Sequence, residues 1–316
     1  MNTAAEHTAR SEDGPDLVGT APRVLYWQVF HRDQSWCDHV VCDVVVPTLK
    51  ALELPGGAHW HFLRYLDERG PHVRVRVVLE GPVPPEEVAR VDEEATSRLE
   101  RSLVALLARE DLEPEPRLVA TPPHLDLGGR GTGVHAGLYE PEVDKYGSFS
   151  GVLTAERVWA RGTGVVARIL PGLRCSRVGR VAAAATLSEL VVEQALDHGA
   201  IDDPVGFWQR FGLFWSGGST PHGKRVFRRA ERMVGRAGLG EEIARMRTDP
   251  LVVRAGDDLA EAVLSGCEEG ARSGVPVATL LSHHAHLQHN RMGAAPQDEP
   301  LIAAALAGRA SGLPGR

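Results

Sequence analysis

A cluster of histidines near the C-terminus is the strongest chemical signal in the chain. Four of the 14 histidines fall within seven residues, at positions 283, 284, 286 and 289. Histidine is the side chain whose ordinary pKa suits proton transfer near neutral pH. On a helix, positions 283, 286 and 289 share one face and position 284 points elsewhere. We therefore expect one of these histidines to act as a general acid or base, with the others as its neighbours.

Two other interpretations of this cluster stay open. Its histidines could belong to an ordinary packed or exposed helix, or they could bind a metal ion. Zinc sites on a helix typically use histidines four residues apart with a remote third ligand. Neither Asp nor Glu lies within residues 276–290. We therefore expect no metal site.

A second patch lies in the strand-like segment 71–77, which reads Pro-His-Val-Arg-Val-Arg-Val. Alternate residues of a strand face the same side, so His72, Arg74 and Arg76 project together while the valines face the core. The planar arginine fork matches the geometry of a carboxylate. An exposed sheet face with solvated arginines is the alternative. Together with Arg64 from the neighbouring strand, the patch predicts a pocket that binds a carboxylate.

A third segment, residues 139–147, carries aromatic and charged residues between the two halves of the chain. A charge run of this kind is usually a solvated loop. Because Tyr139 and Tyr146 frame Glu142 and Lys145 at this junction, we expect the rim of a pocket.

The elements that position these residues divide near residue 150. Strands are predicted at 24–30, 59–66, 72–79, 117–120 and 134–138, with helices at 36–52, kinked at Pro47, and 84–109. Helices then follow at 149–160, 163–170, 180–198, 203–215, 224–236, 240–246, 255–272, 276–290 and 298–308. The fold class is α+β, in which a mixed or antiparallel sheet with flanking helices (23–148) packs on a helical part (149–309). We treat 23–309 as a single domain, with a disordered tail at 1–22 and a flexible tail at 310–316.

Composition narrows the possible partners. The 316 residues are 43% hydrophobic and 24% charged, with a net charge of -7, which disfavours a broad nucleic-acid surface and direct tRNA binding. The four cysteines lack metal-like or redox-like spacing, as in a reduced cytoplasmic protein. No apolar run approaches the roughly 18 residues of a membrane span, and the polar first 22 residues do not form a signal peptide. We expect a cytoplasmic protein without membrane contact.

These motifs occur in an order that resembles the order of motifs in a known protein family. An aromatic strand is followed by His-Trp-His-Phe-Leu-Arg-Tyr (59–65), Gly-Pro-His-Val-Arg-Val-Arg (70–76), Tyr-Glu-Pro-Glu-Val-Asp-Lys-Tyr-Gly (139–147), Ala-Glu-Arg (155–157) and residues 282–293. The series is similar to the C-terminal domain of lantibiotic dehydratases, also found alone as the thiopeptide-type bacteriocin biosynthesis protein. The resemblance covers nearly the whole chain, from about residue 24 to 307.

The resemblance implies an enzyme that modifies a ribosomally made precursor peptide carrying a leader. In full-length members an N-terminal domain glutamylates Ser or Thr using glutamyl-tRNA, and the C-terminal domain eliminates glutamate to leave dehydroalanine or dehydrobutyrine. This chain is too short for the first domain, so a separate glutamylating subunit is implied. No cofactor is implied, and a homodimer is possible.

The resemblance also implies which residues of this sequence occupy the family's active-site positions. Arg74 and Arg76 match the arginines that hold the glutamyl group, and His286 matches the acid/base histidine of the H-x-x-x-N-R stretch. Lys145 stands where the family's E-R-Y-G-G pattern has arginine, which keeps the charge and loses the bidentate fork. The residues expected to contact the substrate are His72, Arg64, Tyr139, Glu142, Tyr146, Ser282, His289, Asn290 and Arg291.

Two alternatives to glutamate elimination stay open. Some stand-alone family members are pyridine synthases, which join two dehydroalanines in a formal aza-[4+2] cycloaddition and expel water and the leader. Lys145 and Ser148 could be adaptations to that reaction. The chain could instead be a non-catalytic subunit that binds the leader, although such a subunit has no need of His286, Arg74 and Arg76.

Overall fold

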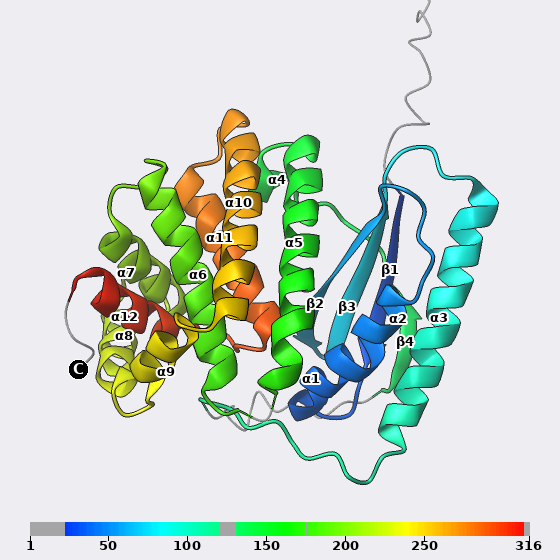
Figure 1. Cartoon of the computed structure of the whole chain (residues 1–316), viewed down its shortest axis with the longest axis horizontal. Coiled ribbons are helices and arrows are strands. Elements are labelled where there is room, and N and C mark those ends of the chain that lie inside the picture. The colour runs from blue at the N-terminus through cyan, green and yellow to red at the C-terminus, as the bar shows by residue number, and fades with distance from the viewer. Residues whose placement is uncertain (1–22, 120–130, 175, 313–316) are drawn as a thin grey trace, which may run out of the picture.

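A computed structural model describes residues 23–119, 131–174 and 176–312 of the chain. The predicted tail at 1–22 and the last four residues of the predicted C-terminal tail lie outside the described residues. A small sheet with its helices occupies one side of the molecule and a helical assembly the other, as Figure 1 shows. The α+β fold class predicted from the sequence is confirmed.

The sheet half begins with β1 (Arg23–Phe30). Four short helical segments follow: η2 (Gln34–Trp36), α1 (Cys37–His39), η3 (Val40–Val45, a π-helix) and α2 (Val46–Lys50). The hairpin of β2 (His59–Asp67) and β3 (Gly70–Leu79), the helix α3 (Pro85–Leu107) and β4 (Gly133–Ala136) follow. All pairings are antiparallel and the strand order is β2-β3-β1-β4.

The register of the sheet separates an apolar face from a polar one. Val73, Val75 and Val77 are fully buried in the core, as predicted for one face of β3. The opposite face aligns Arg74 with Gln28 of β1, and Arg76 with Tyr26 of β1 and His61 of β2. The sheet therefore gathers polar and aromatic side chains from three strands around the two arginines.

The helical half starts with α4 (Val143–Tyr146) and α5 (Phe149–Ile169), and continues with η5 (Leu170–Gly172), α6 (Gly179–Asp197), α7 (Pro204–Trp215), α8 (Pro221–Val234), α9 (Leu239–Met246), α10 (Pro250–Arg272), α11 (Val277–Met292) and α12 (Glu299–Ala310). The helix α6 is buried along most of its length. In Figure 1, α5 stands between the sheet and the other helices. Both α5 and α11 contact the edge strand β2.

The structure differs from the sequence-based prediction at a helix break, at a helix start and at one predicted strand. The helix α5 runs through Gly162 without a break. This glycine allows close packing against α11, since a Cβ there would lie 2.4 Å from Gln288 Oε1. The helix α10 begins at Pro250, capped by Asp249, rather than at residue 255. Residues 117–119 of the strand predicted at 117–120 do not pair with the sheet, and Ala120 lies outside the described residues.

Among the described residues, no helix is both long enough and apolar enough to cross a membrane.

Candidate functional site

The arginines of β3 are half-buried and stacked on aromatic rings. The Arg74 guanidinium carbon lies 3.2 Å from the Tyr65 ring centroid, and that of Arg76 lies 5.0 Å from Tyr26 and 5.1 Å from Tyr139. A cation over an aromatic face is attracted to the ring's negative centre. These contacts restrain both guanidinium groups, as expected for groups that bind an anion at a fixed position.

His72 is fully buried beneath Arg74. Arg74 Nε donates to His72 Nε2 at 3.4 Å, so His72 Nδ1 carries the proton and donates to the Gly70 carbonyl at 3.2 Å. Burial lowers the pKa of His72, which keeps the ring neutral as this pattern requires. His72 therefore orients Arg74.

A buried His61–Glu156 pair lies beside Arg76, and the sequence analysis did not single it out. His61 Nε2 lies 3.9 Å from Glu156 Oε1, and both side chains are almost completely excluded from solvent. Burial lowers the pKa of His61 to about 4. Burial alone would raise the pKa of Glu156, but His61, Tyr139 and Arg76 outweigh it and lower the pKa. A carboxylate is thus held ionised under the sheet face.

His286 has the geometry of a general base held by a carboxylate. Its Nδ1 lies 2.8 Å from Glu299 Oε1, and its ring stacks on Trp215 with centroids 4.2 Å apart. Because Nδ1–H donates to Glu299, Nε2 is left as the proton acceptor. The side chain is 27% exposed, so a ligand can reach it.

An aromatic groove of about 320 Å³ lies next to His286. Helices α7 and α11 form it, and its lining is Phe207, Arg210, Phe211, Phe214, Trp215, Ala278, Thr279, Ser282, His283 and His286. Phe214 is 71% exposed there. An apolar groove with a few polar groups is typical of a binding site for organic ligands.

His289 shares the carboxylate of Glu299 but lies below the surface. Its Nδ1 is 2.6 Å from Glu299 Oε2, and its Nε2 is 2.9 Å from Ser188 Oγ. This Ser–His–Glu series resembles a hydrolytic triad in its order. Ser188, His289 and Glu299 are all buried, and the series holds Glu299 in place.

The segment around α4 contacts the sheet face at Tyr139 and α11 at Tyr146. Tyr139 lies over Arg76, and burial together with Glu156 raises its pKa, so that the phenol stays protonated. Burial lowers the pKa of His283 and the charge of Lys145 lowers it further. His283 and His286 line the same groove.

Four of the residues predicted to bind substrate make contacts within the fold. Arg64 lies on the opposite sheet face from Arg74 and binds Asp38 at 2.5 Å and the Arg291 carbonyl at 3.0 Å. Asn290 Nδ2 donates to the Arg64 carbonyl at 2.9 Å, and Arg291 Nε donates to the Phe62 carbonyl at 3.1 Å. Tyr146 is buried between Trp159 and His284.

Lys145, Glu142 and Ser282, which were also predicted as site residues, are at least partly exposed to solvent. Lys145 and Glu142 are about half exposed and form an ion pair at 2.5 Å. Ser282 is half-buried and donates to the Ala278 carbonyl at 2.8 Å. In the part of the chain that the structure describes, none of the hydrogen bonds, ion pairs or ring contacts joins His286 directly to Arg74 or Arg76.

Across residues 23–119, 131–174 and 176–312, no group of three or more His, Cys, Asp or Glu side chains is placed to hold a metal ion.

The chain belongs to the family of the lantibiotic biosynthesis dehydratase C-terminal region, whose model matches residues 25–310. Among solved structures it is similar to TsrL, with 16% identity and a TM-score of 0.58 over 92% of this chain and 95% of TsrL. It also matches the tRNA dependent lantibiotic dehydratase MibB from Microbispora sp. 107891, with 17% identity and a TM-score of 0.48 over 94% of this chain. The chain spans about 28% of MibB's length. No match was found among curated proteins.

Proposed function

We propose that this protein modifies a leader-bearing precursor peptide, and that it eliminates glutamate from glutamylated Ser or Thr to leave dehydroalanine or dehydrobutyrine. The observation that carries the proposal is the His286–Glu299 pair at the edge of a groove. Elimination removes the α proton of the modified residue and breaks its Cβ–O bond, and glutamate leaves as a carboxylate. A histidine with an open Nε2 can accept that proton.

Arg74 and Arg76 supply the second requirement, which is a site for the departing carboxylate. Two guanidinium groups side by side on one strand face stabilise negative charge as it develops. We expect a bound peptide in extended form to run from the sheet face, where Tyr139 lies over Arg76, to the groove beside His286. The proposed partners are accordingly a precursor peptide and a separate glutamylating subunit, in a cytoplasmic setting.

A pyridine synthase is the second candidate, and Lys145 is the observation that favours it. Its ammonium group is paired with Glu142 and about half exposed, so it is not placed as a third carboxylate-binding cation beside Arg74 and Arg76. Cycloaddition of two dehydroalanines needs proton transfer but has no glutamate to bind. The same His286 and the protonated Tyr139 would serve that reaction.

Mass spectrometry of two synthetic leader-bearing peptides separates these reactions. One peptide carries glutamylated Ser and the other carries two dehydroalanines. Loss of glutamic acid from the first establishes the eliminase, and leader release with a pyridine macrocycle from the second establishes the synthase. If neither peptide changes while the leader binds, the protein is a leader-binding subunit and both enzyme proposals fail.

A further inference from the structure

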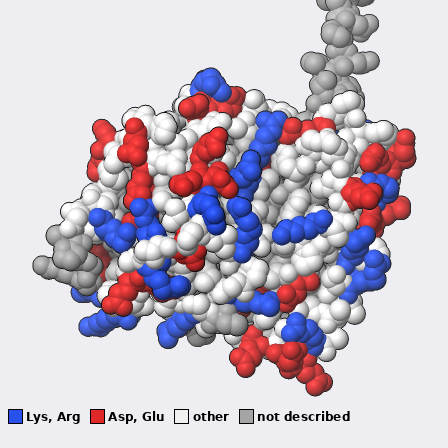
Figure 2. Space-filling model, viewed as in Figure 1, with Lys and Arg blue, Asp and Glu red and all other residues white. Residues whose placement is uncertain are grey.

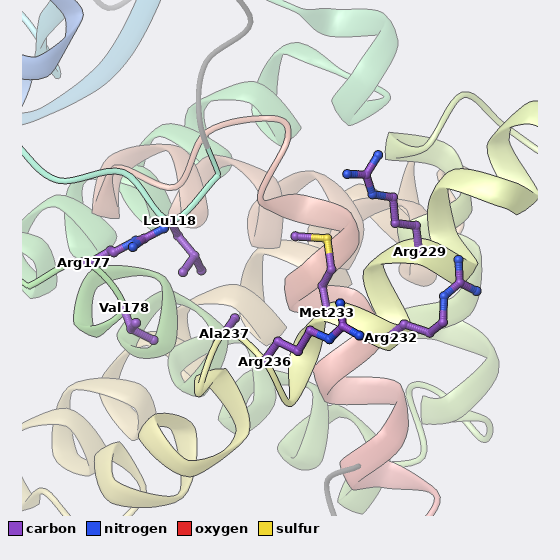
Figure 3. A pocket seen from close by; sticks show the side chains of 8 residues that line it. All are labelled: Leu118, Arg177, Val178, Arg229, Arg232, Met233, Arg236 and Ala237. Carbon is purple, nitrogen blue, oxygen red and sulfur yellow. The ribbon is translucent and has the colours of Figure 1, made fainter.

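A second cavity, of about 660 Å³, lies on the helical half away from the residues described above. Figure 3 shows arginine side chains reaching it from α8, from the segment after α8 and from the turn before α6. Its lining combines cations and apolar side chains: Arg177, Arg229, Arg232, Arg236, Leu118, Val178, Met233 and Ala237.

The arginines come from a helix with one apolar and one basic face. Phe227, Ala230 and Val234 of α8 are buried, which leaves the rest of the helix facing outward. Between residues 221 and 236 the chain has one acid, Glu231, against six basic residues. This local excess of positive charge contrasts with the net charge of -7 of the whole chain. Figure 2 shows blue Lys and Arg side chains at the lower left, where Figure 1 places α8 and α9.

The arginines of the cavity differ from two on and just after α9, which have acidic partners. Neighbouring α9 pairs Arg245 with Glu242 at 2.6 Å, and Arg247 binds Glu193 at 2.7 Å. Within the described ranges, by contrast, the four arginines of the cavity make no hydrogen bond or ion pair. Clustered like charges repel one another, so an unpaired cluster indicates a site where an anion binds.

We propose that this cavity docks an acidic peptide segment that inserts an apolar side chain between its acids. The arginine forks match carboxylates, and Leu118, Val178 and Met233 provide apolar surface for the inserted side chain. A phosphate backbone would use the arginines but leave this apolar surface unfilled. The lining therefore favours a peptide over a nucleic acid.

This docking site rests on the proposed function. An enzyme that acts on one residue of a long peptide gains affinity when it also binds a distant segment of that peptide. A second contact raises the local concentration of the reacting residue without any change in the chemistry. The cavity residues are distinct from those of the sheet face and the aromatic groove. Docking can therefore be measured without turnover.

Fluorescence anisotropy with a short labelled peptide of alternating Glu and Leu tests the proposal. The paired variants are Arg229→Ser with Arg232→Ser in the cavity, and Arg225→Ser with Arg228→Ser on the same helix but outside the cavity lining. Both pairs remove the same charge. We expect the cavity pair to raise Kd at least about fivefold, and the control pair to change it less than about twofold.

Two further probes define the ligand with unmodified protein. A peptide with Gln for each Glu should bind at least about tenfold more weakly, since it lacks the carboxylates. A short single-stranded oligonucleotide should not compete with the acidic peptide. Equal weakening by both variant pairs, equal binding of the Gln peptide, or effective competition by the oligonucleotide would each overturn the proposal. If the acidic peptide binds as expected but neither reaction is observed, the proposed function fails and the docking site stands.

Discussion

His286 Nδ1 lies 2.8 Å from Glu299 Oε1, and this contact fixes which nitrogen of the ring faces the groove. Glu299 is almost fully buried, and burial alone would raise its pKa, but the two histidines that it binds hold the pKa below its usual value. The carboxylate is therefore ionised at neutral pH and keeps the proton of His286 on Nδ1. A base oriented in this way is ready to accept a proton at Nε2.

Replacement of this base should abolish turnover. We expect His286→Ala to lower kcat by about 10² to 10⁴, the usual contribution of general acid–base catalysis, with an unchanged circular dichroism spectrum. His222→Ala is the matched control, because His222 is an exposed histidine of α8. Near-normal kcat in His286→Ala would remove His286 from the mechanism.

The carboxylate behind the base should matter for both rate and stability. Glu299→Gln keeps the size of the side chain but loses the charge that two histidines contact. We expect a smaller loss of kcat than in His286→Ala, and a free energy of unfolding lower by about 1–3 kcal/mol. Urea denaturation and steady-state kinetics measure the two effects, and an unchanged stability would show that the contacts are not maintained in solution.

Arg74 should be needed for turnover while contributing little to folding. We expect Arg74→Ala to reduce kcat/KM by about 10² to 10³, as for other groups that stabilise developing charge. Arg69→Ala is the control, because Arg69 lies in the same hairpin and is 52% exposed, where it pairs with Asp67 and lies over the Phe30 ring. Equal activity of the two variants would exclude a role for Arg74 in binding the leaving group.

Lys145 distinguishes the two candidate reactions. Lys145→Arg introduces the arginine that the family resemblance leads us to expect at this position. It should preserve or raise glutamate elimination, since arginine can bind a carboxylate through two hydrogen bonds. Mass spectrometry of the glutamylated peptide gives the rate. Complete loss of elimination in this variant would point to a specialised role for the lysine.

Buried His284 should make stability depend on pH. Burial lowers its pKa to about 3, whereas the unfolded chain takes up the proton near pH 6.5. The unfolded state therefore binds more protons between these values, and the free energy of unfolding falls as the pH drops through this window.

His284→Leu isolates this effect, because all other titrating groups are common to both proteins. Between pH 7 and pH 5 the wild type should lose about 2 kcal/mol more stability than the variant. Urea denaturation at several pH values gives the difference. Parallel curves for wild type and variant would show that His284 is not buried in the neutral form.

The sequence predicted the sheet well because its signals are local. Alternation of valine with His72, Arg74 and Arg76 identified both faces of β3, and the loop at 67–71 identified the hairpin. The break predicted near Gly162 was wrong because that glycine serves packing between α5 and α11, a contact that no local pattern reveals. Helix starts and ends depend in the same way on distant contacts.

A sequence shows the residue types of a candidate site, but it does not show which partners surround them in the fold. The histidine cluster drew attention to His286, but its carboxylate comes from the start of the next helix. Glu299 could have been noticed as an acid that begins an otherwise apolar helix. His61 and Glu156 are 95 positions apart, and only the packing of α5 on β2 brings them together.

The role of His286 can be tested by mass spectrometry of a leader-bearing peptide with glutamylated Ser, incubated with the wild-type protein and with His286→Ala. We expect loss of glutamic acid with the wild type and an unchanged peptide with the variant. Unchanged peptide with both proteins, or equal conversion by both, would contradict the assignment of His286 and Glu299 as the acid–base pair of a peptide eliminase.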